Sequence, residues 1–382
     1  SGKLLGKWVL PILSGLQAVF LFNLVNGMCG SSEVALDSIL YAITIGLLLP
    51  TAAILCFNSA KEKFSGKSDW LKTIALLVIA LASAFPVYTA SLLLTPTMKV
   101  FGTQLAYYQA VDLSEIHRIF IFVGIITPLV LYFLFRNEEI EARRALVILV
   151  SLVACTQFMS YYGLDGIWKP QADGSRYFSV TALPIHLCHT ALYFTPLCVA
   201  FKWKRAFYFT YFINVFGALI AMFLPNTGGD VSILDPHVYL YWSNHITAYM
   251  VPLLCVALGI FERPKFKQML WSLCFFAAYF VLILFMIGWL SNYVPGYDPT
   301  ELGTGTDYLF INDTYILDSL SDTAFEMMSN HFVTFKVGSL TFAYYPLYQS
   351  IFFVGYVAIA FGMWFVYSLF FTISKTHYEV HG

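Results

Sequence analysis

Residues 263–291 read "RPKFKQMLWSLCFFAAYFVLILFMIGWLS", three basic residues followed by a nearly continuous apolar run. The run at 268–291 is long enough to cross a bilayer as a helix, which takes about 20 residues. Comparable runs recur along the chain, at roughly 8–26, 35–57, 70–94, 116–136, 144–163, 179–200, 205–224, 237–260 and 340–373. The sequence therefore predicts an all-α fold, a polytopic membrane helical bundle of about ten transmembrane helices.

The composition of the whole chain agrees with this fold class. The 382 residues are 59% hydrophobic and only 11% charged, and the mean hydropathy is +0.72. Soluble domains carry about 25% charged residues, so a globular domain with a single anchor is excluded. The net charge of −1 gives no indication of nucleic-acid binding.

The cysteines and the first residues of the sequence also fit a polytopic membrane protein. The 7 cysteines stand singly, mostly within apolar runs, and no CxxC pair occurs, so neither a disulfide scaffold nor a zinc ribbon is indicated. The segment "SGKLLGKWVLPILSG" at 1–15 has basic residues before an apolar run, as a signal peptide does. No small-residue cleavage site follows, so we interpret it as the first membrane helix.

The basic residues orient the predicted bundle. Most of the 21 Lys and Arg residues lie in alternate loops, as do the three that precede the run at 268–291. The exceptions are Lys99, Arg118, Lys169, Arg176 and Lys336. By the positive-inside rule, both termini are predicted to be cytoplasmic.

One long external loop is predicted at 292–339, rich in Asp, Tyr and Gly. This loop could fold as a lid or re-entrant segment over the outer surface, or it could be a solvated loop.

Polar residues gather at one depth in the sixth span. "SVTALPIHLCHTALYFTPLC" at 179–198 places His186 and His189 in its outer third, one helical turn apart. Pro184 can free a backbone carbonyl just above them. Cys188 could line the edge of the same pocket or face another helix. Ionisable residues within a membrane are costly, so they are functional candidates by default.

The eighth span supplies a second set. His237, Tyr241, Asn244 and His245 are spaced i, i+4, i+7 and i+8, which places them on one helical face. Between the two spans lies an external turn, 223–236, whose polar and backbone groups stand near the histidines. The candidates in that turn are Asn226, Gly228 and Gly229. Four histidines on two spans at one depth favour a functional pocket that opens outward.

Several motifs resemble the YwaF-like family of integral membrane proteins. "LPIHLCHTALYF" at 183–194 resembles that family's Leu-Pro-x-His-x-Cys signature. "NTGGDVSILDP" at 226–236, followed by "SNH" at 243–245, resembles its Asn-Pro-Gly-Gly turn and His-bearing helix. "DYLFINDTYILDSL" at 307–320 and "YYPLY" at 344–348 resemble its Asn-Tyr-Met-Phe-Leu and Trp-Pro-Trp-Tyr segments. The series covers about residues 112–370. The resemblance implies a YwaF-like membrane core at residues 112–375, preceded by an N-terminal three-helix membrane extension at residues 1–100.

The resemblance implies a function. Vertebrate relatives of the family include a transmembrane acyltransferase that remodels ether phospholipids through a Cys–His pair. By that match His186 corresponds to the catalytic histidine, and His245 resembles a histidine of the corresponding helix. Ile185 occupies the position of the thiol, so Cys188 would have to supply it. We accordingly expect a multi-pass protein of a bacterial-type plasma membrane whose partners are membrane lipids.

The leading hypothesis is a lipid-active acyltransferase or hydrolase at the external leaflet. His186 would act as general base, His245 or His237 as acid or electrophile, and Cys188 as a conditional nucleophile. Groups that stabilise the oxyanion would come from the turn and the eighth span. The predicted catalytic residues are thus His186, His245, Cys188, His189 and His237, and the predicted substrate-binding residues Asn226, Gly228, Gly229, Asn244 and Tyr241. This hypothesis requires no cofactor.

Three alternatives stay open. In a redox or non-catalytic subunit, His189 and His245 could bind a haem between spans, or His186, His189, His237 and Asp235 could bind zinc. A carrier of small molecules or lipids is compatible with about ten spans and Pro-interrupted helices. A scaffold could use the histidines only to tie helices together.

Overall fold

The structure is a computed structural model in which most of the helical core is described. The structure describes residues 43, 47–62, 69–84, 107–109, 115–161, 168–170, 176–178, 183–223, 230–232, 236–314 and 322–374.

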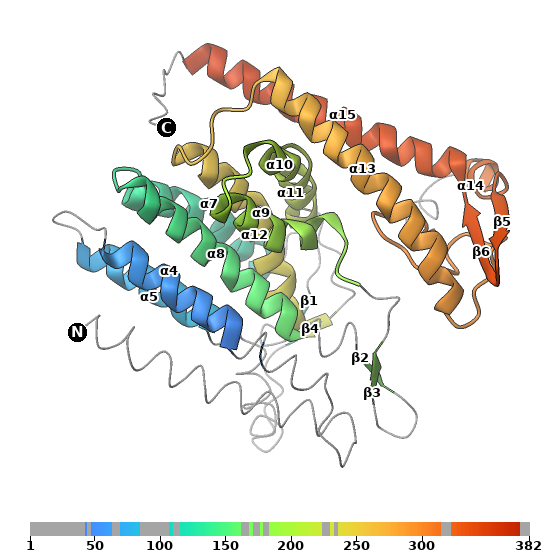
Figure 1. Cartoon of the computed structure of the whole chain (residues 1–382), viewed down its shortest axis with the longest axis horizontal. Helices are drawn as coiled ribbons and strands as arrows, with labels where there is room; N and C mark the ends of the chain where they lie inside the picture. The colour runs from blue at the N-terminus through green and yellow to red at the C-terminus, as the bar shows by residue number, and fades with distance from the viewer. Residues whose placement is uncertain are drawn as a thin grey trace.

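The described fold is mostly helical (Figure 1). The helices are α4 (Leu49–Glu62), α5 (Asp69–Ala84), α7 (Glu115–Phe135), α8 (Ile140–Tyr161), α9 (Leu187–Ala200), α10 (Lys204–Phe209), the π-helix η4 (Thr210–Asn214), α11 (Val215–Phe223), α12 (Pro236–Ala257), α13 (Phe266–Leu290), the 3-10 helix η5 (Ser291–Tyr293), α14 (Asp322–Ser329) and α15 (Pro346–Ser374). The strands β1 (Tyr107–Gln109) and β4 (Asp230–Ser232), β2 (Trp168–Pro170) and β3 (Arg176–Phe178), and β5 (Val333–Val337) and β6 (Leu340–Tyr344) pair as three antiparallel two-stranded sheets.

These helices overlap the predicted apolar runs. Among the described residues, four helical segments are both long and apolar enough to cross a membrane: His117–Phe135, Lys204–Phe223, Phe266–Tyr293 and Pro346–Leu369. A fifth apolar helix, Leu187–Ala200, is shorter. The run at 8–26 lies outside the described residues. The count of about ten spans and the location of the termini stay predictions.

The turns that carry basic residues meet at one end of the bundle. Lys72 of α5 forms a buried ion pair with Glu138 in the turn between α7 and α8. Arg143, at the start of α8, donates to the carbonyl of Leu258 just after α12. In Figure 1 the end of α4 and the start of α5 lie on the same side of the bundle as the α7–α8 turn, away from β5 and β6. Contacts of Lys72 and Arg143 thus join α5, α8, the α7–α8 turn and the end of α12.

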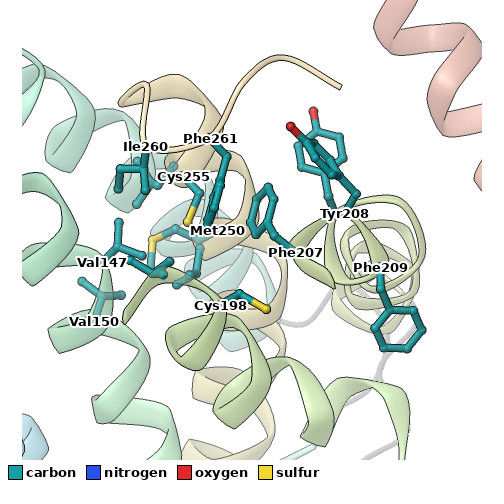
Figure 2. Close-up of a cluster of buried hydrophobic side chains, with 14 of the residues drawn as sticks. Val147, Val150, Cys198, Phe207, Tyr208, Phe209, Met250, Cys255, Ile260 and Phe261 are labelled. Atoms are coloured by element: carbon teal, nitrogen blue, oxygen red, sulfur yellow. The ribbon is translucent and has the colours of Figure 1, made fainter. Parts of the chain in front are cut away.

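The core is built around α8, which packs against α4, α5, α9 and α12. At the basic end, aromatic and aliphatic side chains from four elements close the core (Figure 2). The rings of Phe207 and Phe261 stack with centroids 4.2 Å apart. Cys198 and Cys255 lie in this cluster as free thiols, 0% exposed. Burying these side chains holds α10 and the end of α12 to the rest of the bundle.

The opposite end of α13 carries the β5–β6 hairpin. The side-chain amide of Asn292 pairs with Thr341 of β6 as a strand would, donating to its carbonyl at 2.9 Å and accepting its N–H at 2.8 Å. Gly288 lets β6 approach α13, because a Cβ there would lie 2.6 Å from the ring of Phe342. The hairpin is thus fixed to the helix by backbone groups.

The hairpin corrects one prediction. The apolar run at 340–373 was predicted as a single span, but residues 340–344 are β6 and the helix begins at Pro346. Proline favours the first position of a helix because its missing N–H has no helical partner there. Apolarity alone does not distinguish a buried strand from the start of a helix.

Candidate functional site

The segment before α9 differs from the predicted continuous helix. α9 begins at Leu187, and His186 is its N-cap with extended backbone, φ −65° and ψ 154°. Pro184 therefore precedes the helix, whereas the sequence placed it within a span that began at 179. Proline disfavours helical backbone in the residue before it, so the helix starts only beyond it. His186 lies at the mouth of the helix instead of inside it.

Three tyrosines hold this non-helical segment in place. Tyr193 of α9 donates to the carbonyl of Pro184 at 3.0 Å. Tyr279 of α13 donates to the carbonyl of Ile185. The Tyr308 hydroxyl accepts the N–H of Leu183 at 3.0 Å. Backbone groups that the missing helical turn leaves without partners are thereby satisfied, and His186 has a fixed position.

Residues 306–313, here named the capping loop, cover His186. The ring centroid of His186 lies 5.4 Å from that of Tyr308 and 6.2 Å from that of Phe310. The sequence left open whether residues 292–339 form a lid or a solvated loop. The part at 306–313 packs against the segment before α9 and covers its histidine.

Hydroxyl and amide groups of α15 hold the capping loop from the other side. Tyr348 donates to the carbonyl of Phe310 at 3.0 Å and Tyr356 to that of Leu309 at 3.2 Å. Leu309 and Phe310 both adopt left-handed backbone, with φ of 64° and 59°. This conformation costs roughly 1–2 kcal/mol per residue outside glycine. Two such residues in succession, held by tyrosines, mark a loop whose shape is imposed by its surroundings.

A carboxyl lies inside the capping loop. Asp307 accepts the backbone N–H of Asn312 at 2.8 Å, and the Asn312 amide donates to the carbonyl of Thr306 at 3.0 Å. Burial, together with the nearby carboxyl of Asp313, raises the pKa of Asp307 to about 6 against the lowering effect of the N–H donors. The loop thus contains a group that titrates close to neutral pH.

The structure brings three of the predicted histidines together. The rings of His186 and His189 meet edge to face, with centroids 5.3 Å apart. His189 also packs against Phe158 of α8, at 4.4 Å, and interacts electrostatically with both His186 and His245. Imidazoles from the start of α9 and from α12 therefore lie close enough to interact.

His245 has one ring nitrogen committed. Its Nδ1 lies 2.7 Å from the carbonyl of Tyr241. A carbonyl oxygen only accepts, so Nδ1 is the donor and a neutral ring keeps a lone pair at Nε2. Tyr241 packs its ring against that of His245 at 4.3 Å, while its hydroxyl donates to the carbonyl of Ala221 at 2.6 Å. Tyr241 thus orients His245 and ties α12 to α11.

Cys188 faces α12. Its thiol forms a side-chain hydrogen bond with Asn244, and its sulfur also accepts the N–H of His189. The thiol therefore contacts α12 at the residue next to His245. The Oδ1 atom of Asn244 is buried without a hydrogen-bond partner, and the residue is only 3% exposed. A buried acceptor with no partner is uncommon, so this atom is available to a ligand.

Four predicted site residues cannot be placed with these. Asn226, Gly228 and Gly229 lie outside the described residues. His237 belongs to the first turn of α12, but its side chain is outside the described part of the structure. Their predicted roles stay predictions.

The structure adds residues that the spacing analysis did not nominate. Tyr308 and Phe310 cover His186, Phe158 packs against His189, and Tyr279 and Tyr356 donate to the carbonyls of Ile185 and Leu309. The segment "DYLFINDTY" at 307–315 carried a signal, because it holds aromatic residues beside an Asn and two Asp. Because the segment lies more than a hundred positions after His186 in the chain, the sequence did not reveal the contact between them.

Metal binding was an alternative. In the part of the chain that the structure describes, no group of three or more His, Cys, Asp and Glu side chains is placed to hold a metal ion. The zinc set suggested by the sequence includes Asp235 and His237, whose side chains are not among those described, so that set stays a prediction.

Comparison with known proteins places this site in a family. A family model described as the TMEM164 family matches residues 72–367, most of the chain. The chain belongs to the TMEM164 family. The TMEM164 match runs from α5 to α15, so it includes α9, α12 and the capping loop. It begins before residue 112, where the sequence placed the start of the core.

TMEM164 membership and the apolar helices together support a membrane-associated protein. No curated protein and no solved structure matches the chain.

Proposed function

We propose that this TMEM164-family protein is a lipid-active acyltransferase or hydrolase that works at the external leaflet of a plasma membrane. The observation that supports it is the convergence of His186, His189 and His245 with the Cys188 thiol and the Asn244 amide. Imidazole, thiol and amide are the groups that acyl transfer uses for proton transfer, attack and charge stabilisation. We also propose that the chain is related to the YwaF-like proteins and that it has about ten membrane spans.

His186 is the proposed general base. It stands at the mouth of α9, half-buried, where a substrate can reach it beneath Tyr308 and Phe310. It removes the proton from an attacking hydroxyl, of a lipid or of water, as that oxygen bonds to the acyl carbon. The ester bond then breaks, and a protonated imidazole returns the proton to the leaving oxygen. A lipid acceptor gives acyl transfer and water gives hydrolysis.

His245 is the proposed partner. Its Nδ1–H is committed to the carbonyl of Tyr241, so its Nε2 can accept a proton in one step and donate it in another. When a histidine acts as a base at one ring nitrogen, a hydrogen bond at the other nitrogen fixes the tautomer and the orientation of the ring. His189 interacts with both other imidazoles, those of His186 and His245.

Cys188 provides a second route. If the thiol attacks the ester carbonyl first, its proton passes to an imidazole and then to the leaving lipid oxygen as the ester bond breaks and a thioester forms. The acceptor hydroxyl then attacks the thioester, and its proton passes through the imidazole to the departing sulfur. The Asn244 amide beside the thiol would position it and stabilise negative charge on sulfur. The two routes differ in whether Cys188→Ser abolishes turnover.

The test is a lipidomic time course with purified protein in defined liposomes. We expect the wild type to redistribute acyl chains between phospholipids and added lysophospholipid, or to release fatty acid. His186→Ala and His245→Ala should each lower that rate at least about a hundredfold, the usual contribution of a general base. The matched control is His331→Ala, because His331 is exposed and contacts the carbonyl of Met327.

Two outcomes would contradict the proposal. One is wild-type turnover that the two histidine variants retain in full. The other is an unchanged lipid profile with phospholipid, lysophospholipid and water all offered to a folded wild-type protein.

Transport is a second candidate with its own observation. Asn214 ends the π-helix η4, is 2% exposed, and has neither amide atom hydrogen-bonded. π-helical turns occur often at functional sites, and Pro196 and Pro252 interrupt the neighbouring α9 and α12. A flux assay of lipid or small solutes in the same liposomes would favour this candidate if Asn214→Leu lowered flux and acyl profiles stayed constant.

A further inference from the structure

A groove lies between α13 and α15. These two helices also hold the segment of His186 and the capping loop, which lie on their other side. Its volume is about 690 Å³, within the usual range of roughly 300–1,000 Å³ for ligand sites. Its α13 wall includes Phe280, Leu284 and Phe285, and its α15 wall includes Phe353 and Val354. Both walls belong to helices apolar enough to span a membrane. In Figure 1 these helices lie close together over part of their length and diverge toward β5 and β6.

The groove occupies one end of these helices. It covers the last turns of α13 and the first turns of α15, the end that carries the β5–β6 hairpin and not the end with the basic turns. Polar groups enter its lining only at Tyr344, Gln349 and Ser350. An apolar slot with a polar rim at one end matches a lipid, which is apolar along its chains and polar at its head.

The hairpin extends the apolar lining beyond the helices. Because paired strand residues share a face, the register places Val333, Phe335 and Val337 of β5 on the same face as Tyr344 and Phe342 of β6. Phe335 stacks on Phe342 with centroids 5.4 Å apart and planes 5° apart. Tyr344 belongs to the groove and Phe342 packs against α13. One apolar surface therefore runs from the groove onto the hairpin.

The outer part of that surface is exposed. Val333 is 54% exposed, Phe335 48% and Val337 56%, whereas Thr334 and Lys336 lie on the other face of the same strand. An element that is apolar on one face and polar and cationic on the other fits the boundary between hydrocarbon and head groups. A hairpin at that boundary places the groove in the outer hydrocarbon layer, where the molecules present are acyl chains.

Only one layer of side chains separates the groove from the histidine site. On α13, Phe280 lines the groove while its neighbour Tyr279 donates to the carbonyl of Ile185. On α15, Phe353 lines the groove while Tyr356, one turn on, donates to the carbonyl of Leu309 in the capping loop. A molecule in the groove would press on the same two helices that hold His186 and its cover.

We infer that this groove binds one acyl chain of an external-leaflet glycerophospholipid, with the head group beside Gln349, Ser350 and the hairpin. The inference deepens the proposed function by locating a chain of the lipid substrate, and it rests on that function for the substrate role. Binding itself needs no turnover.

The test uses the full-length protein in liposomes that contain phosphatidylcholine with a photoactivatable diazirine in one acyl chain. After illumination, labelled positions are mapped by mass spectrometry. We expect labelling to concentrate on 280–285 and 346–354. Ser350→Trp, which fills the groove, should lower labelling there about tenfold, equivalent to about 1.4 kcal/mol. Val354→Trp, at an outward-facing and 64% exposed position, is a second filling variant that the fold tolerates.

Gly355→Trp is the matched control. A Cβ at Gly355 meets nothing within 4 Å and the residue does not line the groove, so its labelling should equal that of the wild type. Labelling of the groove no stronger than that of the exposed face of α7 would overturn the inference. Groove labelling without acyl turnover would support the inference and contradict the proposed function; turnover without groove labelling would do the reverse.

Discussion

Substituting Asp307 by Asn tests how the capping loop is held over His186. The carboxyl of Asp307 accepts the N–H of Asn312 at 2.8 Å, and further backbone donors come from Phe310 and Ile311. Burial raises its pKa from the ordinary 3.8 to about 6. The nearest groups that titrate or carry charge are Asp313, Tyr308, Tyr348 and Tyr356. Asparagine keeps a carbonyl acceptor but removes the charge.

The direction of the effect follows from proton binding. Between pH 3.8 and about 6, the folded chain holds a proton on Asp307 that the unfolded chain has released. Stability therefore falls as the pH rises through this window. A shift of this size corresponds to about 3 kcal/mol at 1.36 kcal/mol per pKa unit. The carboxyl is half-buried, so solvent reduces the expected effect to about 1–2 kcal/mol.

Thermal unfolding of the protein in nanodiscs, at pH 4.5 and pH 7, measures this effect. Asp307→Asn should be more stable than the wild type by about 1–2 kcal/mol at pH 7 and equal to it near pH 4. The matched control is Asp298→Asn, because hydrogen bonds from Thr300 hold the pKa of Asp298 below its ordinary value; that change should destabilise at pH 7. A difference between Asp307→Asn and wild type that is independent of pH, or largest at low pH, would refute the reasoning.

Three further predictions concern the helical frame. Lys72→Met should destabilise the fold by about 3–5 kcal/mol, because it leaves the carboxylate of Glu138 buried and unpaired. Adding Glu138→Leu should restore most of the lost stability. A thermal double-mutant cycle measures both effects. Gly288→Val should detach the hairpin, because its side chain would collide with Phe342, and faster proteolysis within 333–344 would report it. Asn214→Leu should raise stability by about 1–3 kcal/mol, because it removes a buried amide with no hydrogen bond. A lower melting temperature would contradict this and would indicate that a bound polar ligand pairs with the amide.

The helical frame was predictable because it depends on local patterns. The runs at 116–136, 144–163 and 268–291 anticipate α7, α8 and α13 to within a few residues. A membrane span needs only a continuous stretch of apolar residues, and that requirement is visible in sequence. The boundary at Pro346 was missed because a short apolar strand and a helical turn share the same composition.

The site was partly predictable for the same reason. The spacing of Tyr241, Asn244 and His245 placed them on one face of α12, and the structure brings Asn244 to Cys188 and His245 to His189. The role of Tyr308 was not predictable, since its contact with His186 joins segments far apart in the chain. His186 itself lies before the helix and not within it, because Pro184 sets where α9 can start.

The central claim is that the histidine site moves acyl chains between lipids. The most direct measurement follows a deuterated acyl chain from phospholipid in liposomes that contain the wild-type protein, in parallel with His186→Ala and His331→Ala. The account predicts that the label appears in lysophospholipid acceptors or in fatty acid with the wild type and His331→Ala, but not with His186→Ala. Label that stays in the donor with the folded wild type, or moves equally with His186→Ala, would contradict the account.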